Sequence, residues 1–76
     1  MHTPAEHLRT LLGFTKAEVG IALKLLEGLS YGEIAQKLGI SYHTVHTHIK
    51  AIHEKAGVST TGRLTALIRG ALEDPK

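Results

Sequence analysis

The sequence of 76 residues contains no cysteine and only three aromatic side chains, Phe14, Tyr31 and Tyr42. Without cysteine, neither a disulfide bond nor a thiolate-bound metal ion can hold the fold together. A chain this short buries only about 60% of its unfolded surface, so we expect dimerisation to add to its stability. No apolar run approaches the roughly 20 residues that span a membrane, and no basic-then-apolar leader is present. We therefore expect a single domain in the cytoplasm, without membrane contact.

The sequence also lacks the residue sets on which catalysis and metal binding depend. No Ser-His-Asp set, paired carboxylates or phosphate-cradling glycine loop can be recognised along the chain. His43 and His46 share a helix face, but no carboxylate or thiolate stands beside them, so we expect no metal site. We predict that the protein is not an enzyme and needs no cofactor.

What the chain does contain, in residues 30–57, is two helical segments joined by a short turn. Ser30 followed by Glu33 is a capping box, and Ser41 caps the second segment. Gly39 lies in the turn, where a left-handed conformation has no steric cost for glycine. Two helices joined by so short a turn must cross sharply, which is the helix-turn-helix arrangement. The apolar spacing predicts a small core made of Ile34, Ala35, Leu38, Val45, Ile49, Ile52 and Ala56.

Positive charge is concentrated in the second half of the chain. The net charge is +2, and residues 1–40 contain as many acidic as basic side chains. Residues 41–69 contain four basic side chains and Glu54 as their acidic one, and four of the six histidines lie within residues 42–56. The second helix of the pair is therefore the basic one, as expected for a helix that meets DNA. The alternative is an ordinary solvated surface.

A short helix is predicted near the N-terminus. Thr3-Pro4-Ala5-Glu6 has the signals of a helix start, and Gly13 ends the segment. Residues 1–13 either pack on the domain as an extension or are a linker from a preceding domain, and the sequence leaves both open. The apolar side of this helix consists of Leu8, Leu11 and Leu12.

Another helix is predicted between Thr15 and about Glu27. Thr15 and Glu18 form a second capping box, and Phe14 before the cap can pack onto the first turn. The predicted core-facing stripe consists of Val19, Ala22, Leu23 and Leu26.

Residues 61–72 form the last predicted helix, and residues 73–76 are a tail. The helix has more apolar residues than so small a core can cover, and an exposed apolar patch marks an interaction site. We interpret the helix as part core and part dimer seam, with all core and no dimer as the alternative. The residues assigned to the seam are Leu64, Leu67, Ile68, Ala71 and Leu72.

Several linked motifs in residues 14–72 resemble the LuxR-type helix-turn-helix domain, also called the FixJ, NarL or GerE type. The family pattern begins with a Thr that is followed by a Glu three residues later. Several short motifs in and around the helix pair come after it. Because so many positions match at fixed spacing, the resemblance is specific. The matching residues are Thr15 with Glu18, Glu27-Gly28-Leu29-Ser30, Glu33-Ile34-Ala35, Leu38-Gly39-Ile40-Ser41, Thr44-Val45 with His48, and Lys55 with Gly57-Val58.

The resemblance implies an all-α fold of four helices, to which this chain adds the short N-terminal helix. It implies that the third domain helix, residues 42–56, lies in the major groove of DNA. It also implies that the fourth joins two copies on an inverted-repeat site. The family's base readers correspond to His46, Thr47 and Lys50, and His43 lies one turn earlier on the same face, opposite the apolar stripe. The family's phosphate contacts correspond to Ser30, Tyr31, Ser41, Tyr42, Thr44 and Lys55.

Some of these positions depart from the family or have a simpler interpretation. His46 stands where the family commonly has Lys or Arg, and an imidazole is mostly neutral at pH 7. Thr61 stands where the family has Arg, so we do not assign to this chain the structural or phosphate contact that the Arg makes in the family. Tyr31 and Tyr42 can equally serve only to pack at helix starts. Lys55 can be a solvated charge near a helix C-terminus, where cations are favoured.

We predict a bacterial, dimeric, sequence-specific DNA-binding regulator of transcription, or the isolated effector domain of a response regulator. Double-stranded DNA and a second copy of the chain are the expected partners, and RNA polymerase is a further candidate. One alternative is a module like region four of a polymerase sigma subunit, which would bind promoter DNA and polymerase. Another is a helical protein-interaction domain that uses the basic face and the last helix.

Overall fold

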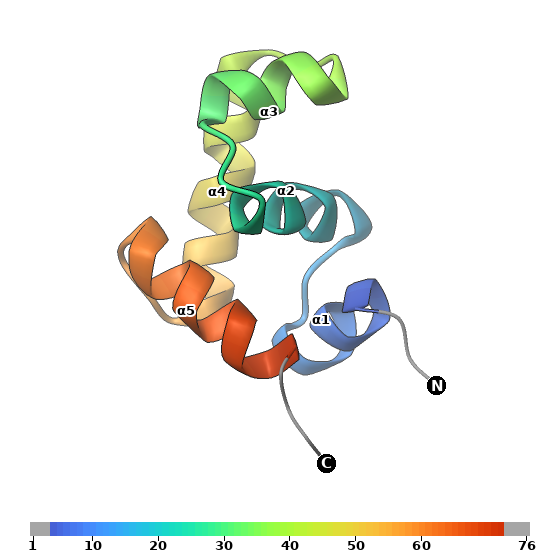
Figure 1. Ribbon diagram of the computed structural model, residues 1–76, viewed down its shortest axis with the longest axis vertical. Helices are drawn as coiled ribbons and strands as arrows, with labels where there is room; N and C mark the ends of the chain where they lie inside the picture. The colour runs from blue at the N-terminus through green and yellow to red at the C-terminus, as the bar shows by residue number, and fades with distance from the viewer. Residues whose placement is uncertain (1–3, 73–76) are drawn as a thin grey trace.

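The structure is a computed structural model, in which residues 4–72 are described (Figure 1). These residues form five α-helices and no strand, which confirms the predicted all-α class with its extra N-terminal helix. The predicted cap Thr3 and the tail, residues 73–76, lie outside the described residues. The helices are α1 (Pro4–Leu12), α2 (Lys16–Leu26), α3 (Tyr31–Leu38), α4 (Tyr42–Ala56) and α5 (Thr61–Leu72).

Capping boxes start α2 and α3. At α2 the Thr15 N–H donates to Glu18 Oε1 over 2.8 Å, and the Glu18 N–H donates to Thr15 Oγ1 over 3.2 Å. The same pair of bonds joins Ser30 and Glu33 at α3, over 2.7 and 3.2 Å. Both capping boxes predicted from the sequence are therefore confirmed, and each satisfies backbone donors that the helix leaves unpaired.

The turn between α3 and α4 has the expected chemistry. Gly39 has a φ of +68°, a left-handed conformation that glycine adopts without steric cost. The Ile40 N–H then donates to the Ala35 carbonyl over 3.1 Å and closes the end of α3. Ser41 Oγ accepts a bond from the Thr44 N–H over 3.0 Å and caps α4. With so few residues between them, the two helices cross sharply.

The core is built from all five helices, with α2 as the central element because it packs against the other four. Leu8 of α1 is fully buried, and α1 contacts both α2 and α5, so this helix packs on the domain. None of the helices in the described part is long and apolar enough to cross a membrane. The other buried apolar side chains are Phe14, Val19, Ile21, Ala22, Leu25, Ile34, Ala35, Val45, Ile49, Ile52, Leu64 and Ile68.

Two leucines lie at the surface, Leu38 from the predicted core and Leu11 from the predicted apolar side of the N-terminal helix. Leu11 is 57% exposed and Leu38 is 40% exposed. Each lies in the last turn of a short helix. Leu12, next to Leu11, is half-buried and packs against the core. The apolar spacing identified the helices correctly but not which of the apolar residues in a last turn reach the core.

The buried face of α2 differs from the predicted stripe. Leu23 and Leu26 are half-buried, whereas Ile21 and Leu25, which the prediction left out, are buried. Because α2 has neighbours on several sides, a single narrow stripe does not describe its buried surface.

α3 and the start of α4 form one end of the molecule (Figure 1), which measures 37 × 25 × 20 Å along its principal axes. α4 is the longest helix, with 15 residues. In Figure 1 it runs along the long axis, with α3 at its upper end and α1 and α5 at the lower end. The N-terminal half of α4 therefore projects from a scaffold that α1, α2 and α5 build.

Candidate nucleic-acid interface

α4 separates its side chains into a buried face and an exposed face. Val45, Ile49 and Ile52 are at most 3% exposed, and through them the helix packs against α2, α3 and α5. The four predicted base readers lie on the other face, and all four are exposed: His43, His46, Thr47 and Lys50. We call these four residues the reading face. The fold therefore brings the predicted readers together on one surface that faces solvent.

Two of the predicted phosphate residues, Ser30 and Ser41, act in the free domain as helix caps. Ser30 and Ser41 are exposed, and their hydroxyls accept bonds from backbone N–H groups of α3 and α4. Ser41 Oγ also lies 2.8 Å from Oγ1 of the half-buried Thr44. Tyr42 beside them is 58% exposed. These side chains surround the N-termini of two helices, where the first N–H groups favour an anion such as phosphate.

Tyr31 differs from the other predicted phosphate residues. It is half-buried, and its hydroxyl lies 2.9 Å from Oγ1 of Thr61, the first residue of α5. Its ring centroid lies 6.3 Å from that of Tyr42 and 6.3 Å from that of His46, which it meets edge-on at 69°. Tyr31 therefore joins the starts of three helices, and its hydroxyl is engaged inside the domain.

Lys55 is held in an ion pair near the C-terminal end of α4. Its Nζ donates to Glu18 Oε1 of α2 over 2.7 Å, and the Glu18 side chain is buried. Burial by itself would raise the pKa of the Glu18 carboxyl. Bonds from Lys55 and from the Thr15 N–H outweigh that effect, so this pKa lies below its usual value. The pair ties α4 to α2 and so fixes the direction in which the reading helix projects.

Sequence reasoning missed this role of Glu18. The residue was identified as the third helical position of a capping box, and Glu33 has the same position in α3. Glu33 is exposed, and a bond from the Ser30 N–H lowers its pKa without any partner on another helix. The two glutamates have the same local sequence signature, so only the packing of α4 over α2 distinguishes them.

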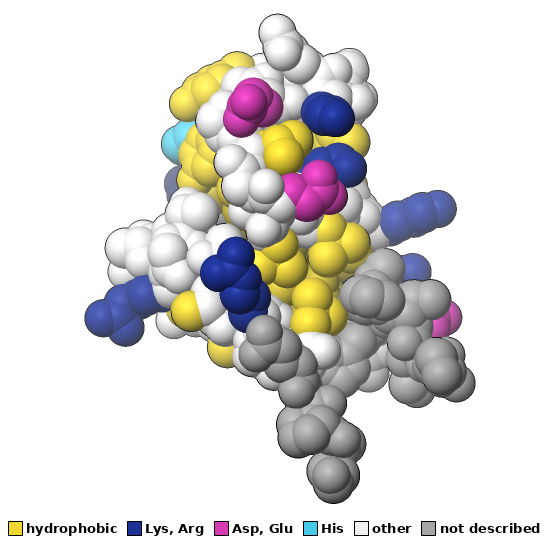
Figure 2. All heavy atoms as spheres, in the orientation of Figure 1, with side chains coloured by type: hydrophobic (Ala, Val, Ile, Leu, Met, Phe, Trp, Pro, Cys, Tyr) yellow, Lys and Arg dark blue, Asp and Glu magenta, His cyan; other side chains and the backbone are white. Residues whose placement is uncertain are grey.

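Positive charge is a property of α4 and α5 and not of the whole surface. The basic side chains of these helices are all exposed, and Glu54 is the acidic one among them. On the face shown in Figure 2, acidic and basic side chains are interspersed, and histidine appears only at the edge. The basic residues in question are Lys50, Lys55, Arg63 and Arg69.

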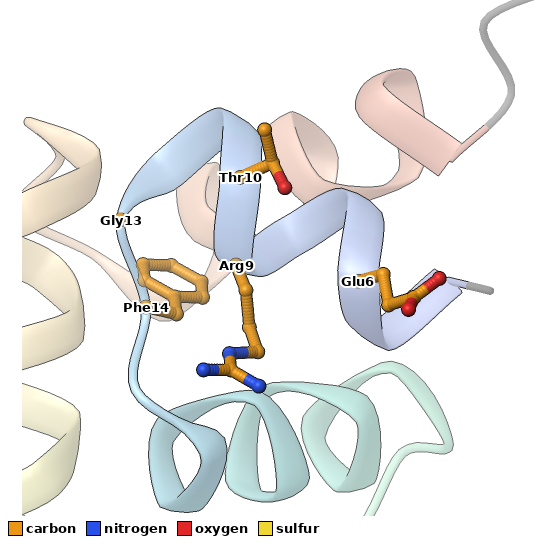
Figure 3. Close-up of a pocket in the computed structure, with 5 residues that line it drawn as sticks. All are labelled: Glu6, Arg9, Thr10, Gly13 and Phe14. Atoms are coloured by element: carbon orange, nitrogen blue, oxygen red, sulfur yellow. The ribbon is translucent and has the colours of Figure 1, made fainter. Parts of the chain in front are cut away.

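A hollow of about 400 Å³ lies between α1 and the start of α2. In Figure 3, Arg9 reaches toward α2 while Glu6 points away from it. Across residues 4–72, no three metal-ligating side chains cluster together. The residues that line the hollow are Glu6, Arg9, Thr10, Gly13 and Phe14.

A smaller hollow of about 250 Å³ lies beside the reading face. It is formed by the start of α3, one side of α4 and the turn that follows α4. His46 and Lys50 of the reading face contribute to its wall, as does Tyr31. The complete lining is Tyr31, His46, Ile49, Lys50, His53, Glu54 and Val58.

The shorter helix α3 is joined by a tight turn to the capped helix α4, which has one buried face and one exposed polar face. This arrangement is that of a helix-turn-helix DNA-binding domain. The chain belongs to the luxR family of bacterial regulatory proteins, whose family model matches residues 12–68. The match runs from the end of α1 into α5, so it covers the helix pair and its scaffold. It confirms the predicted family and, with it, a DNA-binding role in the regulation of transcription.

Relatives of the chain are transcriptional regulatory proteins. The chain is 42% identical over 59 residues to the transcriptional regulatory protein TdiR of Thauera aromatica, a match that covers 78% of this chain and 26% of that protein. It is 49% identical over 45 residues to the transcriptional regulatory protein UhpA of Escherichia coli, covering 59% of this chain and 23% of UhpA. UhpA of Salmonella typhimurium matches with the same identity and coverage. The chain spans about a quarter of the length of these relatives, and no solved structure matches it.

Proposed function

We propose that the chain is the effector domain of a dimeric transcriptional regulator that places α4 in the major groove of an inverted-repeat site. The observation that carries the proposal is the reading face, four exposed polar side chains on a helix whose other face is buried. The major groove of B-DNA admits an α-helix and presents a different pattern of donors and acceptors for each base pair. Because bacterial DNA lies in the cytoplasm, we place the protein there.

The side chains of the reading face suit different base edges. Lys50 can donate to O6 or N7 of guanine, or to a phosphate oxygen. Thr47 Oγ1 donates to the His43 carbonyl over 3.1 Å, so its hydroxyl is engaged on the helix and its methyl group can contact the methyl of thymine. His46 can donate or accept, according to which ring nitrogen carries the proton.

The helix N-termini supply the phosphate contacts in this proposal. Ser30, Ser41, Tyr42 and Thr44 surround the first N–H groups of α3 and α4, and those groups can bond to phosphate oxygens. Lys55 already donates to Glu18. An ammonium group has three donors, so Lys55 can approach a phosphate without giving up that bond.

The dimer seam that we propose on α5 is smaller than the set predicted from the sequence. Leu64 and Ile68 are fully buried in the core of the single chain, so their side chains face inward. Leu67 is 36% exposed, and Ala71 and Leu72 are half-buried. These last three residues form the apolar surface of α5 that a second copy can cover. RNA polymerase is a further proposed partner, because a regulator bound at a promoter meets it there.

Selection of binding sites from random duplex DNA at low salt tests the proposal. We expect a two-fold symmetric motif with half-sites about one helical turn apart. A single asymmetric site would contradict the dimeric assignment and favour a module like region four of a sigma subunit. No enrichment at all would contradict DNA recognition by this chain and favour a protein-interaction domain.

A further inference from the structure

We infer that Tyr31 is a positioning residue, which holds the His46 ring and so sets the specificity of α4 at one base pair, and that its bond to Thr61 anchors it. The inference rests on the proposed function, because it assumes that the reading face meets DNA. It replaces the phosphate contact predicted for Tyr31 from the sequence.

The Tyr31 hydroxyl is directed into the domain, toward α5. It lies 2.9 Å from Thr61 Oγ1, thirty positions further along the chain, and the Tyr31 side chain is half-buried. A tyrosine that served a phosphate would direct its hydroxyl outward, to where the DNA backbone passes. Here the hydroxyl is directed to α5, so the ring is fixed at both ends, by α3 through its own backbone and by α5 through Thr61.

The Tyr31 ring lies beside the ring of His46. Its centroid lies 6.3 Å from that of His46, with the planes at 69°, an edge-to-face arrangement that is favourable for aromatic pairs at this separation. His46 is otherwise exposed, and an exposed side chain loses rotamer freedom when it is ordered against DNA. A ring that already packs against His46 removes part of that loss and restricts the directions in which the imidazole can point.

Tyr31 and two residues of the reading face line the same hollow. Tyr31 forms one wall of the hollow beside the reading face, while His46 and Lys50 form another. The other ionisable side chains of its wall are His53 and Glu54. Tyr31 therefore shares this hollow with two of the four reading residues, and because its ring lies beside that of His46, a change in its position acts first on His46.

Thr61 is one of the positions at which this chain differs from its family pattern, and His46 is another. Because the hydroxyl of Thr61 bonds to Tyr31, we assign to this pair the role of joining the start of α5 to the reading helix. The bond requires both a tyrosine at position 31 and a hydroxyl side chain at position 61, and this chain has both.

The experiment compares affinities for the selected site and for a set of duplexes that each change one base pair. His46→Ala first identifies the base pair that depends on His46. Tyr31→Phe and Thr61→Val each remove the hydroxyl–hydroxyl bond and leave most of the packing in place. One net hydrogen bond corresponds to a factor of about 2 to 10. We expect each variant to reduce discrimination at the His46 base pair by about that factor, and the double variant to lose no more than either single one.

Two matched variants control for the loss of a hydroxyl elsewhere. Tyr42→Phe removes an exposed hydroxyl at the start of α4, and Thr65→Val removes one that bonds to the Gly62 carbonyl within α5. We expect Thr65→Val to leave binding unchanged, and Tyr42→Phe to affect all duplexes equally. Thermal unfolding of each variant shows that it is folded at the temperature of the titrations.

The possible results separate this inference from the proposed function. If the wild-type chain binds no duplex, the proposed function fails and the inference fails with it. If the wild type is specific but Tyr31→Phe weakens all duplexes equally, Tyr31 contacts phosphate or acts only on the fold, and the inference is overturned while the proposed function stands. If Tyr31→Phe and Thr61→Val leave discrimination at the His46 base pair unchanged, the inference is likewise overturned.

Discussion

One face of α4 carries Val45, Ile49 and Ile52, which are almost completely buried, while the other carries four polar side chains that are all exposed. The first face packs against three other helices, and on the second the His46 ring lies beside the Tyr31 ring. A substitution on the buried face should therefore change the free energy of unfolding, and one on the reading face should change DNA binding. Variants of the two faces should separate loss of stability from loss of DNA binding.

The largest expected effect is that of Ile52→Ala on the buried face. Ile52 is fully buried, and truncation of such a side chain costs about 2–5 kcal/mol of unfolding free energy. Urea unfolding followed by circular dichroism measures the loss. His43→Ala on the reading face is the matched control, for which we expect a change within about 0.5 kcal/mol. Equal losses for the two variants would contradict the division of α4 into two faces.

The next effect tests what holds α4 to its scaffold. Glu18→Gln removes the carboxylate that accepts the Lys55 bond, and we expect a loss of about 1–3 kcal/mol at pH 7. Because the pKa of Glu18 is lowered in the fold, its stabilisation is fully present above the ordinary glutamate pKa, about 4.3. It is lost as the pH falls through the lowered pKa.

Unfolding measured between pH 7 and pH 2 should therefore show less pH dependence in Glu18→Gln than in the wild type. Glu33→Gln changes the same position of the exposed capping box and should have the smaller effect on stability. A larger loss for Glu33→Gln would show that the caps matter and that the ion pair between helices does not.

On the reading face, Lys50→Ala should leave stability nearly unchanged and weaken DNA binding. If Lys50 contacts a phosphate, the slope of log K against log salt should fall by about 0.9. If it contacts guanine, discrimination at one base pair should fall instead. Fluorescence anisotropy at several salt concentrations measures both, with Lys24→Ala on α2 as the control. Unchanged affinity and slope in Lys50→Ala would remove this residue from the interface.

The smallest expected effect concerns the exposed side of α5. Leu67→Glu should keep the fold, because the Leu67 side chain already reaches solvent, and should shift a dimer toward monomer in sedimentation velocity. Ala66→Glu introduces the same charge at the neighbouring exposed position and should leave the association unchanged. If Leu67→Glu sediments as the wild type does, α5 is not the seam.

Local chemistry made much of this fold predictable. The two capping boxes, Gly39 in the turn and the stripe of Val45, Ile49 and Ile52 depend on residues within a few positions of each other, and the structure contains all of them. The exposure of the four reading residues follows from the same helical period, since positions opposite a buried stripe face solvent.

Contacts between distant residues were not predictable in this way. The bond between Lys55 and Glu18 and that between Tyr31 and Thr61 each join residues thirty or more positions apart. In both cases the sequence allowed another partner, a phosphate, for the same side chain. The seam on α5 shows the same limit, because the spacing of Leu64 and Ile68 shows that they share a face but not that the single chain buries them.

The central claim is that the reading face of α4 is the surface that meets DNA. Amide chemical shifts of the ¹⁵N-labelled chain, recorded as the selected duplex is added, test this claim most directly. We predict that the largest changes fall on His43, His46, Thr47 and Lys50 and on the first residues of α3 and α4, with small changes along α1. Changes centred on α1 or on the exposed side of α5, with the reading face unaffected, would contradict the account.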